Sequence, residues 1–413
     1  MLVVALLMLL PGLFIVIAIN HRTHNAWNPA SVMFYIWSVL LLLATSLGSA
    51  WGYYPVDISG IFLVSFFLNV ILLVFLVGCN KEIAISYEVK KCNTYALCVF
   101  LIFLYLFSEV MYFSRLHAYI PLQTLPSNVW KWKMLILSGT FQENSVLFIG
   151  RNLPIIGTII SYTFINTESK KRKFFLGTVI LLYVVLAFIY PRRDVMINKL
   201  VHLLVPFVFK YRNRMKKLAK LILPIAVVFT FVFFYINDKL TFGNGDVKQS
   251  IALYSFGAFN SLQKAIDIGY APNSELLMGN TFYFVYMVLK YIFPQLAPPG
   301  IVLETLGNDT SNVYSSLIAP VIDSRGSYIL LIAITIIYAC WIGFCFVIAY
   351  NWYVKKQTVA AMCFYSTIFS CVIRSFYNPT FSYSDIVFGM IYSMILVVIT
   401  QTKKEKGTLV IKI

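Results

Sequence analysis

Charged side chains are scarce in this sequence, and acidic ones are scarcest. Only 12% of the 413 residues are Asp, Glu, Lys or Arg, against about 25% in soluble globular proteins. Hydrophobic residues make up 60% of the chain and aromatic residues 17%. This composition excludes an ordinary soluble domain and predicts a polytopic membrane protein, because apolar runs of about 20 residues cross a bilayer as helices.

Several familiar catalytic and metal-binding patterns are also missing. The chain has no phosphate-binding loop of the Walker type, no G-x-G-x-x-G turn and no H-E-x-x-H pair. Its seven Cys show no metal-ligand spacing and fall mostly inside apolar runs, so we interpret them as small reduced hydrophobes. We expect no metal site and no cofactor. The net charge of +17 comes mostly from short loops, where it sets membrane orientation, so we expect no nucleic-acid partner.

Long apolar runs divide the chain into about eleven expected spans within a single transmembrane domain, 1–413. The opening run lacks a basic leading region and a small-residue cleavage site, so we expect a retained span and not a signal peptide. We find no internal repeat. The expected spans are 2–20, 30–50, 58–78, 94–113, 146–165, 174–190, 194–209, 218–236, 327–350, 358–377 and 382–401.

Basic residues are distributed unequally between alternate loops. The odd-numbered loops and the C-terminal tail carry the strongest clusters, such as KKRK at 170–173 and KYRNRMKKLAK at 210–220. The positive-inside rule therefore predicts a cytoplasmic C-terminus, a periplasmic N-terminus and an external segment over 237–326. The turn PRRD at 191–194 departs from this rule, because it lies in an external loop. Arginines that snorkel to the headgroups are the simple alternative for this turn.

Charged residues within or beside the expected spans gather at one level. Arg151, Arg374, Glu109 and Asp385 each lie near the external end of a span, and Arg325 lies just outside one. Charges inside a membrane are costly and commonly functional. Random snorkelling would scatter them over both leaflets, so we expect a shared role.

Helical spacing predicts where these groups face. Asp194, Asn198 and His202 repeat every four residues, with Lys199 beside them. Polar stripes avoid lipid, so we expect them to face the bundle interior or a wet cavity. Ordinary interhelical hydrogen bonding is the alternative, especially for the serines. The tenth expected span carries a second stripe, formed by Ser366, Ser370, Arg374 and Asn378. The eleventh carries a third, formed by Asp385, Gly389 and Ser393.

Several arginines at the outer-leaflet level suit a multiply charged anion carried by a lipid. Guanidinium groups bind phosphate oxygens in pairs and stay protonated at working pH. A diphosphate carries enough negative charge to hold three or four of them together. The pattern predicts a lipid diphosphate that enters sideways, with its headgroup at the arginines.

The external segment is the one sizeable part expected outside the membrane. It begins with a turn-rich piece, 237–250, and continues with a predicted amphipathic helix over 252–270. The aromatic run 281–299 suits a helix at the membrane interface. The following piece, 300–331, is rich in Asn, Ser, Thr and acidic residues. We expect it to fold over a site for hydroxyl-rich material.

The run SNVYSSLIAPVIDSRGSYILL, which leads into the ninth span, resembles Wzy-type oligosaccharide repeat-unit polymerases. The family pattern of an Asn-Val-Tyr-Thr-like start and an Asp-x-x-Gly step matches 312–315 and 323–326. Its arginine ahead of a basic cytoplasmic loop matches Arg192 or Arg193. The topology of the whole chain is similar, and motif-level likeness covers 188–220 and 276–350. The chain departs by IFPQ at 292–295, where relatives carry an Ile-Pro-Arg-like piece, and by Arg325 where they often carry an aromatic.

The resemblance implies an all-α fold of about eleven spans, similar to GT-C membrane glycosyltransferases, and a metal-independent glycosyl transfer. A growing glycan would pass from undecaprenyl diphosphate to a sugar hydroxyl of a new lipid-linked repeat unit. Arginines would stabilise the departing diphosphate, and a carboxylate would accept the hydroxyl proton. Asp323 is the first candidate for this base, ahead of Glu304, Asp309, Asp194 and His117, of which His117 also suits a plain solvated loop residue.

Residue roles follow from that implication. The expected catalytic residues are Asp323, Arg193 and Arg325. Asp194 either orients Arg193 or binds substrate. Because this chain has no arginine at 292–295, we expect Arg325 or Lys290 to bind the anion in its place. The expected substrate-binding residues are Arg151, Arg192, Arg374, Asp194, Asn312, Tyr314 and Lys290.

Expected partners are the undecaprenyl-diphosphate-linked oligosaccharide, the bilayer of a bacterial inner membrane and a Wzz-type chain-length regulator. Two other functions share parts of the pattern. An O-antigen ligase acting on lipid A-core uses the same donor and a similar topology. A flippase of the lipid-linked glycan predicts cations along the full depth of the bundle, whereas only Lys199 and His202 lie deeper here.

Overall fold

The computed structural model describes residues 1–80, 94–142, 146–189, 193–211, 220, 257–268, 276–296 and 315–400. These ranges contain helices and turns but no strand, which confirms the predicted all-α class for the described residues. Six of the described helices are long and apolar enough to cross a membrane. They are α1 (Leu2–Thr23), α2 (Pro29–Leu47), α3 (Ile58–Gly78), α4 (Thr94–His117), α8 (Lys170–Ile189) and α15 (Tyr328–Lys356).

The other expected spans also coincide with helices, although these helices are shorter, bent or more polar. They are the bent pair α6 (Ile149–Asn152) and α7 (Ile155–Asn166), then α9 (Arg193–Tyr211), α16 (Val359–Arg374) and α17 (Asp385–Thr400). Apart from residue 220, the span expected at 218–236 lies outside the described residues. Each expected span that the structure describes therefore corresponds to a helix.

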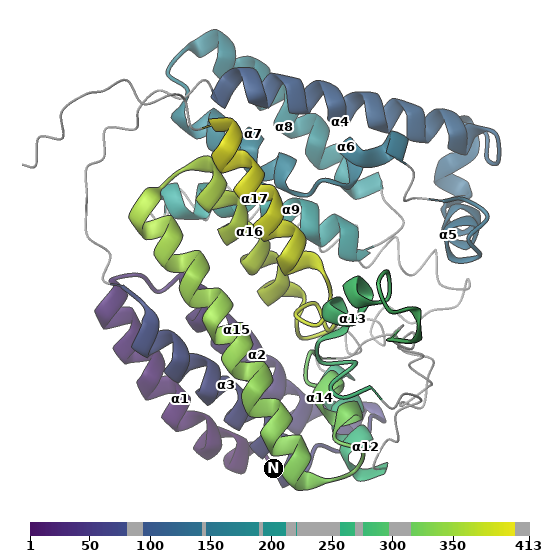
Figure 1. Ribbon diagram of the computed structural model, residues 1–413. Helices are drawn as coiled ribbons and strands as arrows, with labels where there is room; N and C mark the ends of the chain where they lie inside the picture. Colours follow the sequence, from purple (N-terminus) through teal and green to yellow (C-terminus); the bar gives the residue numbers. More distant parts are fainter. Residues whose placement is uncertain are drawn as a thin grey trace, which may run out of the picture.

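The helices form two groups joined by a central one (Figure 1). Helices α1, α2, α3 and α15 pack together on one side, and α4, α6, α7 and α8 lie on the other. Between them lies α16, which packs against α2 and α15 as well as α7, α9 and α17. The larger hydrophobic core fills the first group and extends onto α16, and a second core lies between α4, α7 and α8.

Side-chain caps begin three of these helices. The Asn28 side chain accepts a hydrogen bond from the Ser31 backbone N at 2.9 Å at the start of α2. Ser327 and Thr358 do the same for α15 and α16. Each cap satisfies a backbone donor that has no partner within the helix, and is worth about 1 kcal/mol.

The span made of α6 and α7 bends by 48° at Leu153–Pro154. Proline cannot donate the hydrogen bond that would continue α6 into α7. Ahead of the bend, Gly150 lies against α4, where its backbone N donates to Ser108 Oγ at 3.1 Å. A Cβ atom at Gly150 would collide with the Leu104 carbonyl. The glycine thus permits the close approach that places Arg151 beside α4.

Parts of the expected external segment pack on the ends of the helices. The amphipathic helix predicted over 252–270 is confirmed as α12 (Ala258–Ile268), which packs on α3 and on α14 (Ile318–Asp323). The run expected at the interface forms only a short helix, α13 (Tyr283–Leu289). In its first turn, the Phe284 backbone N donates to the Ser382 carbonyl at 3.1 Å. This contact fastens the segment to the turn between α16 and α17, as the neighbouring ribbons show (Figure 1).

Candidate functional site

The polar face of α9 lies between two clusters of polar and charged groups. Asn198 and His202 line a cavity shared with α16 and α17, while Lys199 reaches Glu109 on α4. Lys199 and His202 are buried, at 3% and 0% exposure. The prediction that this stripe avoids lipid is therefore confirmed for these two residues.

The first cluster places one carboxylate between two cations. Glu109 Oε2 lies 3.5 Å from Arg151 Nε, and Glu109 Oε1 lies 3.2 Å from Lys199 Nζ. The Arg151 guanidinium also stacks 3.2 Å from the centre of the Tyr112 ring, and Lys199 Nζ lies 4.8 Å from that of Tyr105. All three charged side chains are at most 4% exposed. Buried charges persist when they are paired in this way, and the trio carries a net charge of +1.

The second cluster centres on an ion pair between neighbouring helices. Arg374 Nη2 at the end of α16 donates to Asp385 Oδ2 at the start of α17, at 2.6 Å. Arg374 Nε also donates to the Ser370 carbonyl at 3.3 Å. Ser370 Oγ in turn donates to Asn198 Oδ1 at 2.5 Å. The arginine side chain is 6% exposed, whereas that of Asp385 is 37% exposed, so the pair is reachable from the aspartate side.

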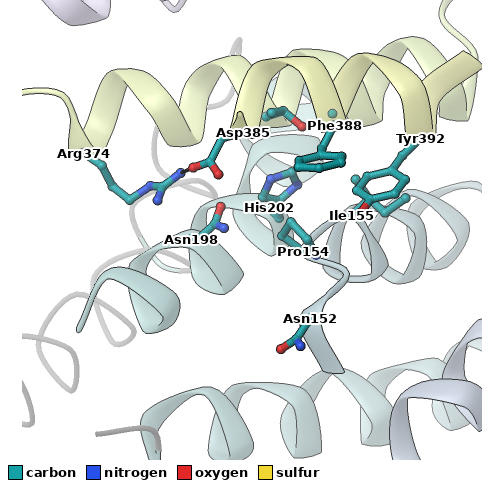
Figure 2. Close-up of a pocket in the computed structure, with 11 residues that line it drawn as sticks. Asn152, Pro154, Ile155, Asn198, His202, Arg374, Asp385, Phe388 and Tyr392 are labelled. Carbon is teal, nitrogen blue, oxygen red and sulfur yellow. Dashed lines mark hydrogen bonds and ion pairs between the residues drawn. The ribbon is translucent and has the colours of Figure 1, made fainter. Parts of the chain in front are cut away.

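A cavity of about 140 Å³ adjoins this ion pair. Figure 2 shows its lining side chains converging from α9, from α17 and from the bend between α6 and α7. Because α7 begins at the cavity, the positive end of its helix dipole lies there. The polar and aromatic lining includes Asn152, Asn198, His202, Arg374, Asp385 and Tyr392.

The cavity opens beside an apolar helix face. Phe388 on α17 lines it and is 49% exposed. Farther along α17, Ile391, Met394 and Val398 are also exposed. A row of exposed apolar side chains on a membrane helix is expected to contact lipid. A lipid-linked headgroup could therefore reach this cavity from the side.

Hydrogen bonds fix the orientation and tautomer of His202. Thr158 Oγ1 lies 2.8 Å from the His202 carbonyl oxygen and 3.0 Å from His202 Nδ1. The single hydroxyl proton goes to the carbonyl, because a carbonyl oxygen can only accept. Thr158 Oγ1 then accepts from the ring, so Nδ1 carries the proton and Nε2 presents a lone pair. No described group hydrogen-bonds to Nε2.

Two of the predicted anion-binding residues belong to these clusters. Arg151 and Arg374 are 2% and 5% exposed, which confirms that neither snorkels into lipid. They lie in separate clusters, each with its own carboxylate. Asp194 is half-buried in the first turn of α9. Arg193 is the first residue of that helix, and its side chain lies outside what the structure describes.

The remaining predicted residues lie elsewhere. Lys290 follows α13 and is half-buried, and Arg325 is exposed just after α14 at a φ of 52°. Neither lines the cavity. The structure therefore does not place these two residues in the same pocket as Arg374, and their predicted anion-binding role stays a prediction. Arg192, Asn312 and Tyr314, and the alternative bases Glu304 and Asp309, lie outside the described residues.

Asp323 forms a compact set of hydrogen bonds with the segment before α13. Its Oδ1 accepts from the backbone N and Nδ2 of Asn280, at 3.2 and 2.8 Å. Its Oδ2 accepts from the backbone N and Oγ1 of Thr281, at 2.7 and 2.6 Å. These four donors occupy both carboxylate oxygens and tie Asp323 to the segment before α13. This geometry favours a structural role for Asp323 over its predicted role as the base.

Sequence reasoning did not assign a site role to Glu109, Lys199, Asp385, Asn152 or His202. The signal was present for Glu109 and Asp385, which are charges at the expected external level, and for Lys199 and His202, which lie on the polar stripe of α9. Asn152 has no such signal, because only the bend of the span brings it to the cavity.

Comparison with known proteins does not assign the chain to a family. No family model matches the chain, and no curated protein or solved structure matches it. The class that the fold defines is a helical, multi-pass membrane protein with buried charged clusters. A more particular function is therefore inferred from the residues themselves.

Proposed function

We propose that this protein polymerises lipid-linked oligosaccharide repeat units, as Wzy-type O-antigen or capsule polymerases do. It would act at the periplasmic face of a bacterial inner membrane as an eleven-span, GT-C-like glycosyltransferase. The growing glycan leaves undecaprenyl diphosphate and joins a hydroxyl of a new lipid-linked unit. No metal is required in this scheme, because arginines stabilise the departing diphosphate.

One observation carries the proposal: the buried Arg374 lies beside a polar cavity that opens next to an apolar helix face. An isolated guanidinium at this depth is costly, so its placement calls for an anionic partner. Asp385 supplies that partner at 2.6 Å. A diphosphate has more charge and more acceptor oxygens than one carboxylate, so it can compete for the same guanidinium. The partly exposed Asp385 side of the pair is where it would arrive.

The cluster around Glu109 supports the same function. Arg151 and Lys199 together exceed the charge of Glu109 by one. Arg151 and Lys199 each adjoin in sequence a residue that lines the cavity, Asn152 and Asn198, so both cations lie close to the proposed anion site. Arg193, in the first turn of α9, is the predicted third arginine of this region. A chain-length regulator would bind elsewhere on the same membrane face.

The proposal is tested by the glycan ladder of cells that depend on this protein. We expect Arg374→Gln and Arg193→Ala to remove long glycan chains, with a rate loss of about 10²–10³-fold for a missing oxyanion stabiliser. Arg172→Gln is the matched control, because Arg172 is an exposed arginine on α8 stacked 4.5 Å from the Tyr95 ring. Protein levels in the membrane must remain normal in each variant.

The form of the defect separates the alternatives. A polymerase defect leaves single repeat units attached to the lipid A-core, because ligation continues. A ligase defect removes all glycan from the core. A flippase defect leaves lipid-linked units on the cytoplasmic side. Long chains in both the Arg374 and Arg193 variants would refute the proposed site.

A further inference from the structure

The hydrogen-bonding state of His202, a residue of the cavity lining, follows from its neighbours. Its Nδ1 donates to Thr158 Oγ1 at 3.0 Å, since the Thr158 proton is committed to the His202 carbonyl at 2.8 Å. The Nε2 lone pair is thus left on the other edge of the ring. A histidine held in one tautomer by a neighbour is suited to accept a proton at its free nitrogen.

The free nitrogen belongs to a residue that lines the cavity, and it has no partner among the described residues. His202 lines the cavity and is fully buried, and Nε2 has no hydrogen bond. A buried acceptor without a donor is unfavourable, so such groups mark places where a ligand or water donates. The missing donor here is an O–H or N–H group that enters the cavity.

The cavity favours a sugar hydroxyl as that donor. Two amide side chains, Asn152 and Asn198, and the Tyr392 ring line it together with His202 (Figure 2). Amides that hydrogen-bond hydroxyls and rings that stack on them suit a polyol. Its volume of about 140 Å³ equals that of several water molecules, at about 30 Å³ each. That space can admit the hydroxyl-bearing edge of one sugar unit.

The other ionisable groups around the ring are less suitable as the base. Asp385 on α17 has its Oδ2 occupied by Arg374 on α16 at 2.6 Å. Lys199 on α9 already donates to Glu109 at 3.2 Å, and a lysine ammonium carries donors only. Tyr392 on α17 is a proton donor at neutral pH. The Thr158 hydroxyl on α7 already donates to the His202 carbonyl and accepts from its Nδ1.

We propose that His202 Nε2 is the general base that deprotonates the acceptor sugar hydroxyl, which binds in this cavity. The proposal rests on the proposed function. The acceptor O–H bond breaks, its proton moves to Nε2, and the oxygen forms a bond to the anomeric carbon of the donor. The bond from that carbon to the diphosphate breaks, and its electron pair leaves with undecaprenyl diphosphate. The imidazolium then releases the proton to water.

The test uses the full-length protein in lipid nanodiscs and lipid-linked oligosaccharide extracted from its own source cells. His202→Gln places a non-basic amide near the Nε2 position, and His202→Asn retains a donor for Thr158 near the Nδ1 position. We expect kcat to fall about 10²–10⁴-fold in both, the usual range for a missing general base. KM should change by only a few fold, and thermal stability should stay near that of the wild type in His202→Asn.

A pH profile separates a base from a structural residue. The wild-type rate should fall at acid pH as His202 becomes protonated, and the residual rate of His202→Gln should lose this limb. Asp385→Asn should keep it, because its carboxylate is not the base. If Asp385→Asn removes the limb, or if both His202 variants keep kcat within about threefold of wild type, the inference is overturned.

The proposed function and the assignment of the base fail in different ways. If wild-type protein does not elongate the lipid-linked oligosaccharide, the proposed function is wrong. If wild type elongates it and the His202 variants do so equally well, only the assignment of the base is wrong. Equal losses of activity and thermal stability in both variants would assign His202 a structural role instead.

Discussion

The buried trio of Arg151, Glu109 and Lys199 gives the sharpest prediction about stability. Glu109→Gln keeps the size of the side chain and removes its charge, so both cations lose the carboxylate that they share. At an effective dielectric constant of about 20, unit charges at these separations of 3.2 and 3.5 Å attract by about 5 kcal/mol each. Desolvation offsets part of this gain. Measured losses on removing one partner of a buried pair are about 3–5 kcal/mol.

We therefore expect Glu109→Gln to lower the free energy of unfolding by about 5 kcal/mol, at the top of that range, because two cations lose their partner. Solvent screening does not reduce this figure, since the three side chains are at most 4% exposed. Lys199→Met should cost less, because Glu109 and Arg151 remain as a neutral pair. The double variant should be more stable than the sum of the two losses predicts.

Unfolding of the purified protein in mixed micelles, followed by tryptophan fluorescence, measures all three variants. The matched control is Glu168→Gln, which removes a carboxylate from the turn before α8. That change should cost no more than about 1 kcal/mol, as for other surface charges. A loss below about 1 kcal/mol for Glu109→Gln, or strict additivity in the double variant, would refute the electrostatic reasoning.

Two further predictions concern the external segment and the chemistry. Asp323→Asn turns an acceptor into a donor that faces the donors of Asn280 and Thr281, so we expect a loss of about 1–3 kcal/mol per unsatisfied group. Hydrogen exchange should then accelerate over 276–296, and unchanged exchange would contradict the structural role of Asp323. Glycan transfer should persist in the presence of a chelator, because arginines carry the charge stabilisation; abolition by chelation and recovery with added Mg²⁺ would argue for a metal-dependent reaction.

The helices were predictable because their cause is local. An apolar run long enough to cross a bilayer is recognisable as a helix from its length alone, and polar residues spaced by four show which face of that helix is polar. The burial of Arg151, Arg374 and Lys199 follows from the cost of charge in lipid, so it too was predictable. The sequence also indicated the amphipathic helix α12.

The pairing of these groups was not predictable, because it depends on contacts between distant segments. Asp323 belongs to a recognisable Asp-x-x-Gly step, which suggested chemistry. Its four donors come from Asn280 and Thr281, more than 40 residues earlier in the chain. The state of His202 depends in the same way on a hydroxyl from another helix, 44 residues away. A residue type at a given position does not reveal such partners.

Helix α16 has a mechanical consequence for the whole protein. Every residue from Val359 to Arg374 except Ile373 is buried, and the helix packs on both groups of the bundle. A helix enclosed in this way is held in place, since turning or sliding it would disturb close-packed side chains on all sides. Any rocking of the two groups against each other, as alternating access across a membrane demands, would therefore require α16 to repack on at least one side.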